Sequence, residues 1–331
     1  MNKFVFTCGD INGIGPEIVI KALNRITRQK TSDKYFFICP LNIFETATLS
    51  IKPTFTYEIE NQKNQDSSAS VTLINPGTSK QSIGKPTITS GKAAFKSLVL
   101  SYDLLEKGEA DAVITAPISK TAIKIAGINF SGQTEMFARW TNTKKYAMSF
   151  LSKKMCAALF TIHYPIKDVS KLFNFNKLST LVEVIIKTLK FDLEILEPKI
   201  AVLGLNPHAG ENGIMGKEEI DIILPVIQKY SKSVEIEGPF SSDAFFGSKA
   251  YKKYDMIIGM YHDQILIPFK LLNFRSGVNY TAGLPIVRTS PDHGVAYDIA
   301  GKFISDESSI LQAFKYAKRI VNNRKKISGK E

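Results

Sequence analysis

Histidine is scarce in this chain, and the positions where it occurs are suited to metal binding. The 331 residues include four histidines, each in or beside a turn-rich segment at the end of a predicted strand: His163, His208, His262 and His293. Ligands of α/β proteins bind at the carboxyl ends of strands, and neutral imidazoles are common ligands of zinc-type metals. Three of the four, His163, His208 and His262, could therefore converge on one metal ion. Their spacings of 45 and 54 residues match no local metal-binding motif, which leaves structural roles open.

Basic and polar side chains in the C-terminal third could hold an anionic substrate. Lys270, Asn279 and Arg288 lie on turn-rich segments, where an ammonium, an amide and a planar guanidinium can bind a phosphate or a carboxylate. Taken singly, each of them is more typical of a solvated surface. Asp243 follows another turn, where it could act as a ligand, a base or a helix cap.

Two further segments bring polar groups or glycines to the start of a helix. In FSGQTEM (130–136), Gln133 and Thr134 could donate to an anion; alternatively, Ser131 or Thr134 could cap the helix. GDINGIGPE (9–17) follows a strand and opens a helix with Pro16 in its first turn. It is not G-x-G-x-x-G, so it does not predict a Rossmann-type nucleotide site. Its glycines could serve a tight turn or close contact with a ligand.

The elements that must position these residues alternate between short β-branched runs and longer helical stretches, which predicts an α/β fold. The predicted strands are Phe4–Cys8, Tyr35–Cys39, Ala112–Thr115, Met155–Ile162, Lys199–Leu205 and Met256–Met260. The predicted helices are Pro16–Arg28, Gly91–Lys107, Val169–Phe173, Lys177–Leu189, Lys217–Ser231 and Ser309–Asn322. The polar segment Glu60–Ser70 is expected to be an exposed loop.

Composition narrows the class of protein. A hydrophobic fraction of 44% is ample for a core, and no apolar run reaches the roughly 18–20 residues of a membrane span. Three isolated cysteines argue against a disulfide framework and for a reducing compartment, so we expect a cytoplasmic protein. The net charge of +12 raises the alternative of nucleic-acid binding, but no aromatic-interleaved basic stripe is present, so we expect anionic small molecules instead.

Taken together, these motifs resemble the 4-hydroxythreonine-4-phosphate dehydrogenase family of pyridoxal phosphate biosynthesis. The segments that carry the resemblance run in the family's order across nearly the whole chain: GDINGIGPEI, ITAPISK (114–120), SGQTEMFA, TIHYP, LNPHAGENGIMGKEEID (205–221), GPFSSDAFF, MYHDQ and RSGVNYTAGLPIVRTSPDHGVAYDIAG (275–301). The combination of LNPHAGE, MYHDQ and GLP-x-x-RTS-x-DHG is highly specific.

The resemblance implies a two-lobed α/β/α fold with a central cleft, like that of isocitrate and isopropylmalate dehydrogenases. Residues 1–331 would form one two-lobed catalytic unit in which the chain crosses between the lobes, at boundaries that the sequence does not show. The family forms homodimers with the active site at the subunit interface. No membrane and no nucleic acid are expected as partners.

The resemblance also implies roles for individual residues. The metal ligands would be His163, His208 and His262, one of them supplied by the neighbouring subunit. The substrate-binding residues would be Gln133, Thr134, Lys270, Asn279 and Arg288. A nucleotide-facing loop would contain Asp292, His293 and Gly294. Lys270 and Asp243 are the candidates for the catalytic base.

The implied reaction is the NAD- or NADP-dependent oxidation of 4-phosphooxy-L-threonine, followed by decarboxylation to 3-amino-2-oxopropyl phosphate. A divalent metal such as zinc, magnesium or cobalt would act as a Lewis acid. One residue departs from the family, which commonly has His where this chain has Gln133. Gln can donate a hydrogen bond to a phosphate but carries no charge. A paralogous dehydrogenase acting on another phosphorylated hydroxy-acid, such as a four-carbon sugar acid 4-phosphate, is therefore the alternative; a catalytically silent scaffold fits the retained residues less well.

Overall fold

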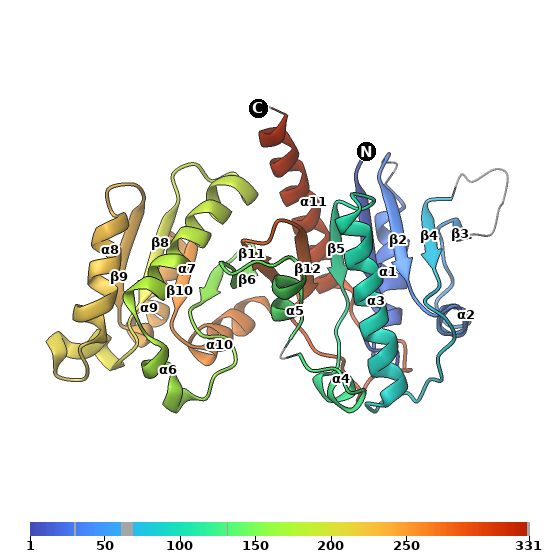
Figure 1. Ribbon diagram of the computed structural model, residues 1–331, viewed down its shortest axis with the longest axis horizontal. Coiled ribbons are helices and arrows are strands. Elements are labelled where there is room, and N and C mark those ends of the chain that lie inside the picture. Colours follow the sequence, from blue (N-terminus) through green and yellow to red (C-terminus); the bar gives the residue numbers. More distant parts are fainter. Residues whose placement is uncertain (30, 61–68, 131, 330–331) are drawn as a thin grey trace. The chain divides into compact units, whose positions relative to one another are not determined.

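The computed structural model describes residues 1–29, 31–60, 69–130 and 132–329 (Figure 1). Most of the predicted loop Glu60–Ser70 lies outside these residues. The chain divides into two compact units, and it crosses between them more than once. The first unit contains Met1–Thr141 and Ile286–Val321, and the second contains Asn142–Pro285 and Asn322–Glu331.

The first unit is built on parallel strands in the order β3-β4-β2-β1-β5-β12. Their bounds are β1 Lys3–Thr7, β2 Lys34–Ile38, β3 Tyr57–Ile59, β4 Val71–Ile74, β5 Ala112–Thr115 and β12 Val287–Pro291. Its helices are α1 Gly15–Ile26, α2 Leu41–Thr48, α3 Ile88–Glu106, α4 Lys120–Ile125, α5 Gln133–Trp140 and most of α11 Ser308–Ser328. Strand β5 is buried at every position, which is typical of a parallel sheet covered on both faces.

The second unit has a mixed sheet in the order β11-β6-β7-β10-β8-β9. Its strands are β6 Ala147–Leu151, β7 Ala157–Leu159, β8 Lys199–Leu203, β9 Glu235–Phe240, β10 Met256–Gly259 and β11 Val278–Ala282. Strand β6 pairs antiparallel with β7 and β11, whereas β7, β10, β8 and β9 run parallel. Its helical segments are α6 Ile166–Leu172, α7 Phe175–Lys187, η1 Thr188–Asp192, η2 Pro207–Gly213, η3 Glu219–Ile223, α8 Leu224–Tyr230, α9 Ser242–Gly247, η4 Ala250–Lys253 and α10 His262–Asn273.

The predicted α/β class and all six predicted strands are confirmed, although the predicted strand Met155–Ile162 shrinks to β7. The predicted helix Lys217–Ser231 is split, because a wide π-helical turn at Glu219–Ile223 precedes α8. Pro225 lies at the start of α8, where its missing N–H removes one regular hydrogen bond. Helix α10 was not predicted, since Pro268 within it is typical of a helix break.

The glycines of the GDINGIG segment have a packing reason within the first unit. A Cβ on Gly15 would lie 2.1 Å from the carbonyl oxygen of Cys8, and one on Gly13 would lie 2.6 Å from that of Val295. Gly9 has φ +64°, and its Cβ would lie 2.3 Å from the carbonyl oxygen of Pro117. These contacts favour close backbone packing over the ligand-contact alternative.

We expect Gly15→Ala to destabilise the protein by about 2–3 kcal/mol, because the methyl group would overpack against backbone that cannot rotate away. Urea unfolding of the purified variant measures this loss. Gly247→Ala is the matched control, since no atom lies within 4 Å of a Cβ built there. Equal midpoints for Gly15→Ala and the wild type would show that the turn is more compliant than these distances indicate.

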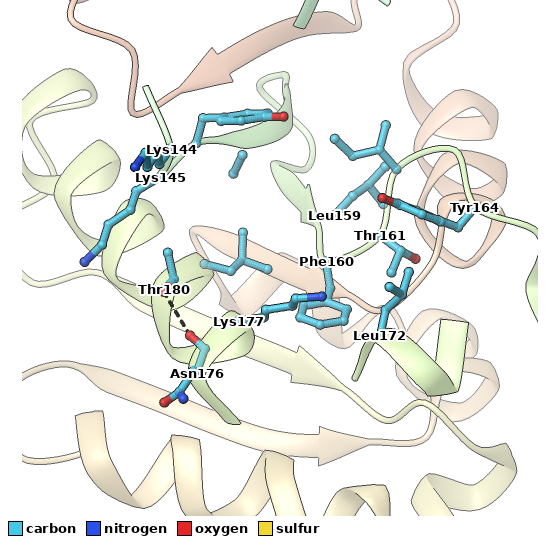
Figure 2. A pocket seen from close by; sticks show the side chains of 14 residues that line it. Lys144, Lys145, Leu159, Phe160, Thr161, Tyr164, Leu172, Asn176, Lys177 and Thr180 are labelled. Atoms are coloured by element: carbon cyan, nitrogen blue, oxygen red, sulfur yellow. Dashed lines mark hydrogen bonds between the residues drawn. The ribbon is translucent and has the colours of Figure 1, made fainter. Parts of the chain in front are cut away.

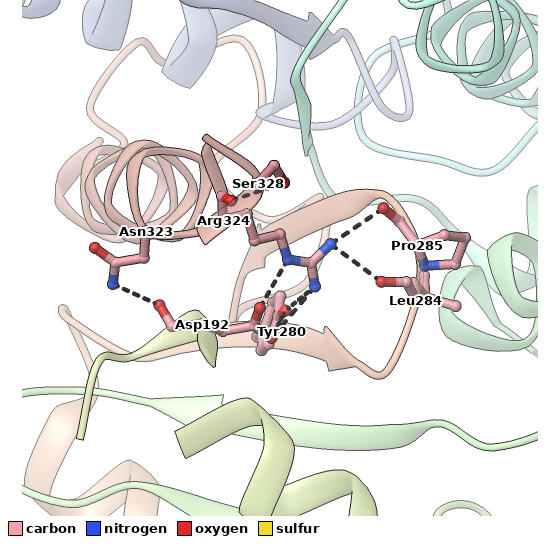
Figure 3. Close-up of polar contacts among 7 residues, drawn as sticks. All are labelled: Asp192, Tyr280, Leu284, Pro285, Asn323, Arg324 and Ser328. Carbon is pink, nitrogen blue, oxygen red and sulfur yellow. Dashed lines mark hydrogen bonds and ion pairs between the residues drawn. The ribbon is translucent and has the colours of Figure 1, made fainter. Parts of the chain in front are cut away.

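A buried ionic cluster ties the end of α11 to the rest of the second unit (Figure 3). Arg324 donates from Nε to Oδ1 of Asp192 at 2.7 Å, and from Nη1 to the carbonyl oxygens of Leu284 and Pro285 at 3.1 and 3.2 Å. The hydroxyl of Tyr280 donates to Oδ2 of Asp192 at 2.5 Å. Burial raises the pKa of Tyr280, and the Asp192 carboxylate raises it further, so Tyr280 remains a hydrogen-bond donor at neutral pH.

We expect Asp192→Asn to lower the free energy of unfolding by about 2 kcal/mol, because the half-buried guanidinium of Arg324 loses the counter-charge of its hydrogen-bond partner. The measurement is again urea unfolding. Lys326→Met, on the same helix, breaks an exposed pair with Glu194 and should cost less than about 1 kcal/mol. Similar losses in the two variants would contradict the stabilising role of the buried pair.

Candidate active site

Arg288 and Gln133 are far apart in the sequence and are brought together in the first unit. Arg288 lies in β12, beside β5, and is only 3% exposed. Its Nε and Nη2 donate to Oγ1 of Thr115 at 3.2 and 2.9 Å, and Nη2 also donates to Oε1 of Gln133 at 2.9 Å. Two of the predicted substrate-binding residues thus form one hydrogen-bonded group with Thr115, which ends β5.

The buried guanidinium gives this group a positive charge. Burial lowers the pKa of Arg288 to about 9, and the charge of Glu135 opposes that shift. Arg288 therefore stays protonated at neutral pH. A buried cation is costly unless hydrogen bonds and negative charge compensate it, so the group is suited to an anionic ligand.

The start of α5 places Gln133 and Thr134 without using them as caps. The N-cap residue is Gly132, and no side-chain cap bond is formed there, so the capping interpretation is wrong for Thr134. Ser131 lies outside the described residues. Thr134 is 1% exposed, and the Nε2 of Gln133 donates to the carbonyl oxygen of Ala116 at 3.4 Å. The amide of Gln133 thus turns its oxygen toward Arg288.

In the second unit, His163 and His262 lie side by side. The centres of their rings are 5.8 Å apart, with the ring planes inclined by 36°. This proximity follows from the sheet, because β7 and β10 are parallel neighbours and the two histidines follow their carboxyl ends. Nδ1 of His262 is 2.7 Å from Oδ1 of Asp263, an arrangement that orients the ring and leaves Nε2 for a ligand.

The third predicted metal ligand, His208, lies on the exposed segment Pro207–Gly213. Within the described residues, no three His, Cys, Asp or Glu side chains form a group that could hold a metal ion. The pair of imidazoles fits two positions of a zinc-type site, whereas a catalytic site of this kind has three protein ligands. One chain therefore brings together two of the three predicted ligands.

The two candidates for the catalytic base differ in their surroundings. Asp243 is exposed, and its pKa is lowered by the Ser241 hydroxyl, which donates to Oδ1 at 2.5 Å, with a smaller contribution from the charge of His208. A carboxylate with a lowered pKa is a weak base at neutral pH. Lys270 is exposed on α10, and Asn279 is half-buried in β11.

The predicted nucleotide-facing loop follows β12. The backbone N–H of Asp292 donates to Oγ of Ser309 at 3.3 Å, and Nδ1 of His293 is 3.1 Å from the carbonyl oxygen of Gly294. The carbonyl oxygen of the next residue, Val295, accepts from the N–H of Ile14. The loop therefore lies against the glycine-rich turn 9–15.

Asp10 and Thr115 are candidate functional residues that sequence reasoning did not single out. Asp10 is fully buried, and burial raises its pKa; its Oδ2 accepts from the hydroxyl of Tyr297 at 2.8 Å. Asp10 lies just after the predicted strand Phe4–Cys8, and Thr115 is the last residue of the predicted strand Ala112–Thr115. That position is the signal that could have identified them.

A separate pocket of about 480 Å³ opens in the second unit (Figure 2). Lys144 and Lys145 lie on one side, Tyr164 lies on the other, and Lys177 borders it between them. None of the predicted site residues lines this pocket. It is therefore distinct from the histidine pair, although Ile162 and Tyr164 on its wall flank His163 in the sequence.

Comparison with known proteins gives one consistent result. Residues 29–317 match the family described as "Pyridoxal phosphate biosynthetic protein PdxA". A 4-hydroxythreonine-4-phosphate dehydrogenase from Sulfurihydrogenibium sp. is 41% identical over 319 residues, covering 96% of this chain and 98% of the relative. One from Desulforapulum autotrophicum is 39% identical, covering 94% of this chain and 93% of the relative.

Solved structures agree with these relatives. The crystal structure of 4-hydroxythreonine-4-phosphate dehydrogenase from Klebsiella pneumoniae matches with a TM-score of 0.79 and 32% identity, covering 97% of this chain and 100% of that chain. No helix among the described residues is both long and apolar enough to cross a membrane.

Proposed function

The chain belongs to the PdxA family of pyridoxal phosphate biosynthetic proteins, and on that premise we propose that it catalyses the reaction for which its relatives are named. It would oxidise 4-phosphooxy-L-threonine with NAD or NADP and decarboxylate the product to 3-amino-2-oxopropyl phosphate. The observation that carries this proposal is the buried, protonated Arg288, which a phosphorylated acid would neutralise.

The phosphorylated substrate would be held by charged and polar side chains. Arg288 and Thr134 would bind its anionic groups, and Gln133 would orient the guanidinium through their 2.9 Å hydrogen bond. Lys270 and Asn279 would contribute further contacts. The lowered pKa of Asp243 makes its carboxylate a weak base, which favours Lys270 for that role.

His163 and His262 would hold a divalent metal such as zinc, magnesium or cobalt, together with His208 of the partner subunit. The paired rings support the proposal for the first two ligands, and imidazole nitrogens are common ligands of such ions. When bound, the metal would lower the pKa of the substrate hydroxyl and stabilise negative charge on the product of decarboxylation. Asp263 would orient His262 toward it.

The loop Asp292–Gly294 would face the nicotinamide nucleotide, which accepts the hydride. It lies in the same unit as Arg288 and directly follows the strand that contains it. We also infer a cytoplasmic protein, since the sequence has three isolated cysteines, Cys8, Cys39 and Cys156, an arrangement that argues against a disulfide framework.

A homodimer with the active site at the interface is supported by the outer face of α10. Ile267, Leu271 and Phe274 are 59%, 82% and 81% exposed and recur at helical spacing, which makes an apolar stripe. A contiguous apolar surface of this kind marks a protein contact. Since His262 begins the same helix and Lys270 lies on it, a partner covering the stripe would lie close to the site.

A second candidate substrate is favoured by one residue. Gln133 accepts a hydrogen bond from Arg288 and adds no charge of its own, so a phosphorylated hydroxy-acid with a different anionic group could fit better. A panel that includes a four-carbon sugar acid 4-phosphate separates the two candidates.

The test is NADH formation by the purified protein with 4-phosphooxy-L-threonine and NAD, before and after a chelator, with His208→Ala as a control. We expect turnover that the chelator abolishes, that added metal restores and that His208→Ala lacks. Absence of turnover with metal present would reject the named substrate and direct the search to the panel.

A further inference from the structure

The segment that contains His208 has an unusual backbone. His208, Ala209, Gly210, Glu211 and Asn212 have consecutive φ values of 50°, 51°, 81°, 43° and 54°. In this left-handed region an L-residue other than glycine costs roughly 1–2 kcal/mol. Four of the five residues are not glycine, so surrounding contacts must hold the segment in this conformation.

The carboxylate of Glu219, which is 2% exposed, lies beside this segment. Its Oε1 accepts from the backbone N–H groups of Leu205 and Asn206, both at 2.8 Å. Its Oε2 accepts from Nδ2 of Asn206 at 3.0 Å. Three donors at the entrance to the segment thus converge on one buried carboxylate.

The segment also winds closely around this carboxylate. A Cβ on Gly210 would lie 2.7 Å from Oε2 of Glu219, and one on Gly204 would lie 3.2 Å from Oε1. Glu219 itself begins the π-helical turn that leads into α8, so it is fixed to a packed element. The carboxylate therefore connects the left-handed segment to the core of the second unit.

We propose that Glu219 is a positioning residue that fixes the left-handed segment and thereby the direction in which His208 is presented to the metal. This inference rests on the proposed function, in which His208 is a ligand. Glu219 does not contact the metal or the substrate. It acts through the backbone of Leu205 and Asn206, as outer-shell residues of metal sites do.

The test compares Co²⁺ binding by metal-free wild type and Glu219→Gln, followed by the visible absorption of bound cobalt. Gln has the size of Glu, but an NH₂ group replaces one of the two carboxylate oxygens. That NH₂ group would face one of the N–H donors from which the carboxylate of Glu219 now accepts, so two donors would face each other. We expect 10–100-fold weaker binding. NADH formation should fall at limiting metal and recover at saturating metal, which a general loss of folded protein would not show.

Glu218→Gln is the matched control. It removes the same charge one residue earlier, but Glu218 is half-buried, and among the described residues it accepts from the side chain of Asn206 at 2.8 Å and from no backbone N–H. We expect its cobalt affinity to remain within about threefold of wild type. If Glu219→Gln does not fold, Glu219→Asp, which keeps the charge but shortens the reach, provides the same comparison with an expected loss of about tenfold.

Each outcome has a separate meaning. Equal cobalt affinities for wild type and the Glu219 variant would overturn the positioning role and leave the metal site intact. A wild type that binds no cobalt would overturn the metal site itself, and this inference with it. Weaker binding that excess metal overcomes, with the Glu218 variant unaffected, supports the inference.

Discussion

Arg288→Lys is expected to lower kcat/KM for 4-phosphooxy-L-threonine by about 100-fold, mostly through KM. The planar guanidinium of Arg288 donates to Thr115 and Gln133 and has further N–H groups that could donate to an anion. A lysine ammonium is a point charge and cannot reproduce this geometry. Hydrogen bonds to charged groups contribute about 1.5–3 kcal/mol each, so loss of one or two corresponds to this factor. Steady-state NADH formation over a range of substrate concentrations measures it.

Gln133→His is the companion variant for this experiment, because the resemblance described above implies His at this position. If Gln133 weakens phosphate binding, this variant should lower KM for 4-phosphooxy-L-threonine several-fold. If Gln133 instead selects another substrate, KM should fall for this compound and rise for the preferred one. An Arg288→Lys variant with unchanged KM would contradict the anion-binding role of the buried guanidinium.

The second large effect is expected from mixed dimers. His208→Ala and His262→Ala should each be inactive alone, yet their co-expression should restore about one quarter of wild-type activity. His163 and His262 lie together in one chain, so a chain lacking only His208 keeps that pair and can receive His208 from its partner. Random assembly makes half of the dimers mixed, and each mixed dimer has one complete site of two.

The pairing of His163→Ala with His262→Ala is the control for mixed dimers. Both residues belong to the same side of the site, so no combination of these chains completes it, and activity should stay absent. Restoration by this pair would show instead that His163 and His262 of one site come from different subunits. Gel filtration of each mixture confirms that dimers have formed.

Local sequence patterns identified several of the strands, some candidate site residues and one tight turn of this protein. Apolar runs such as Ala112–Thr115 and Lys199–Leu203 bury all or most of their side chains, so hydrophobicity alone located them as strands. The strand ends then indicated where polar residues would gather, and His163 and His262 were both identified in this way. The glycines of segment 9–15 also marked a tight turn, because few other residues fit so close to backbone.

Tertiary structure decided the features that depend on partners distant in the sequence. The hydrogen bond between Arg288 and Gln133 joins residues 155 positions apart, and only the register of β12 beside β5, together with the position of α5, brings their side chains together. Helix α10 forms despite Pro268 because its buried face, including Ile265 and Phe269, packs into the core.

The same distinction holds for His208. Its sequence context indicated a turn, but no local propensity favours five consecutive left-handed residues. We infer that the buried carboxylate of Glu219, which accepts from the backbone N–H groups of Leu205 and Asn206, holds that conformation. Residue type and periodicity therefore sufficed to locate six of the strands and candidate residues such as His163 and His262. The directions of the side chains required the folded chain, because burial and long-range hydrogen bonds outweigh local preferences there.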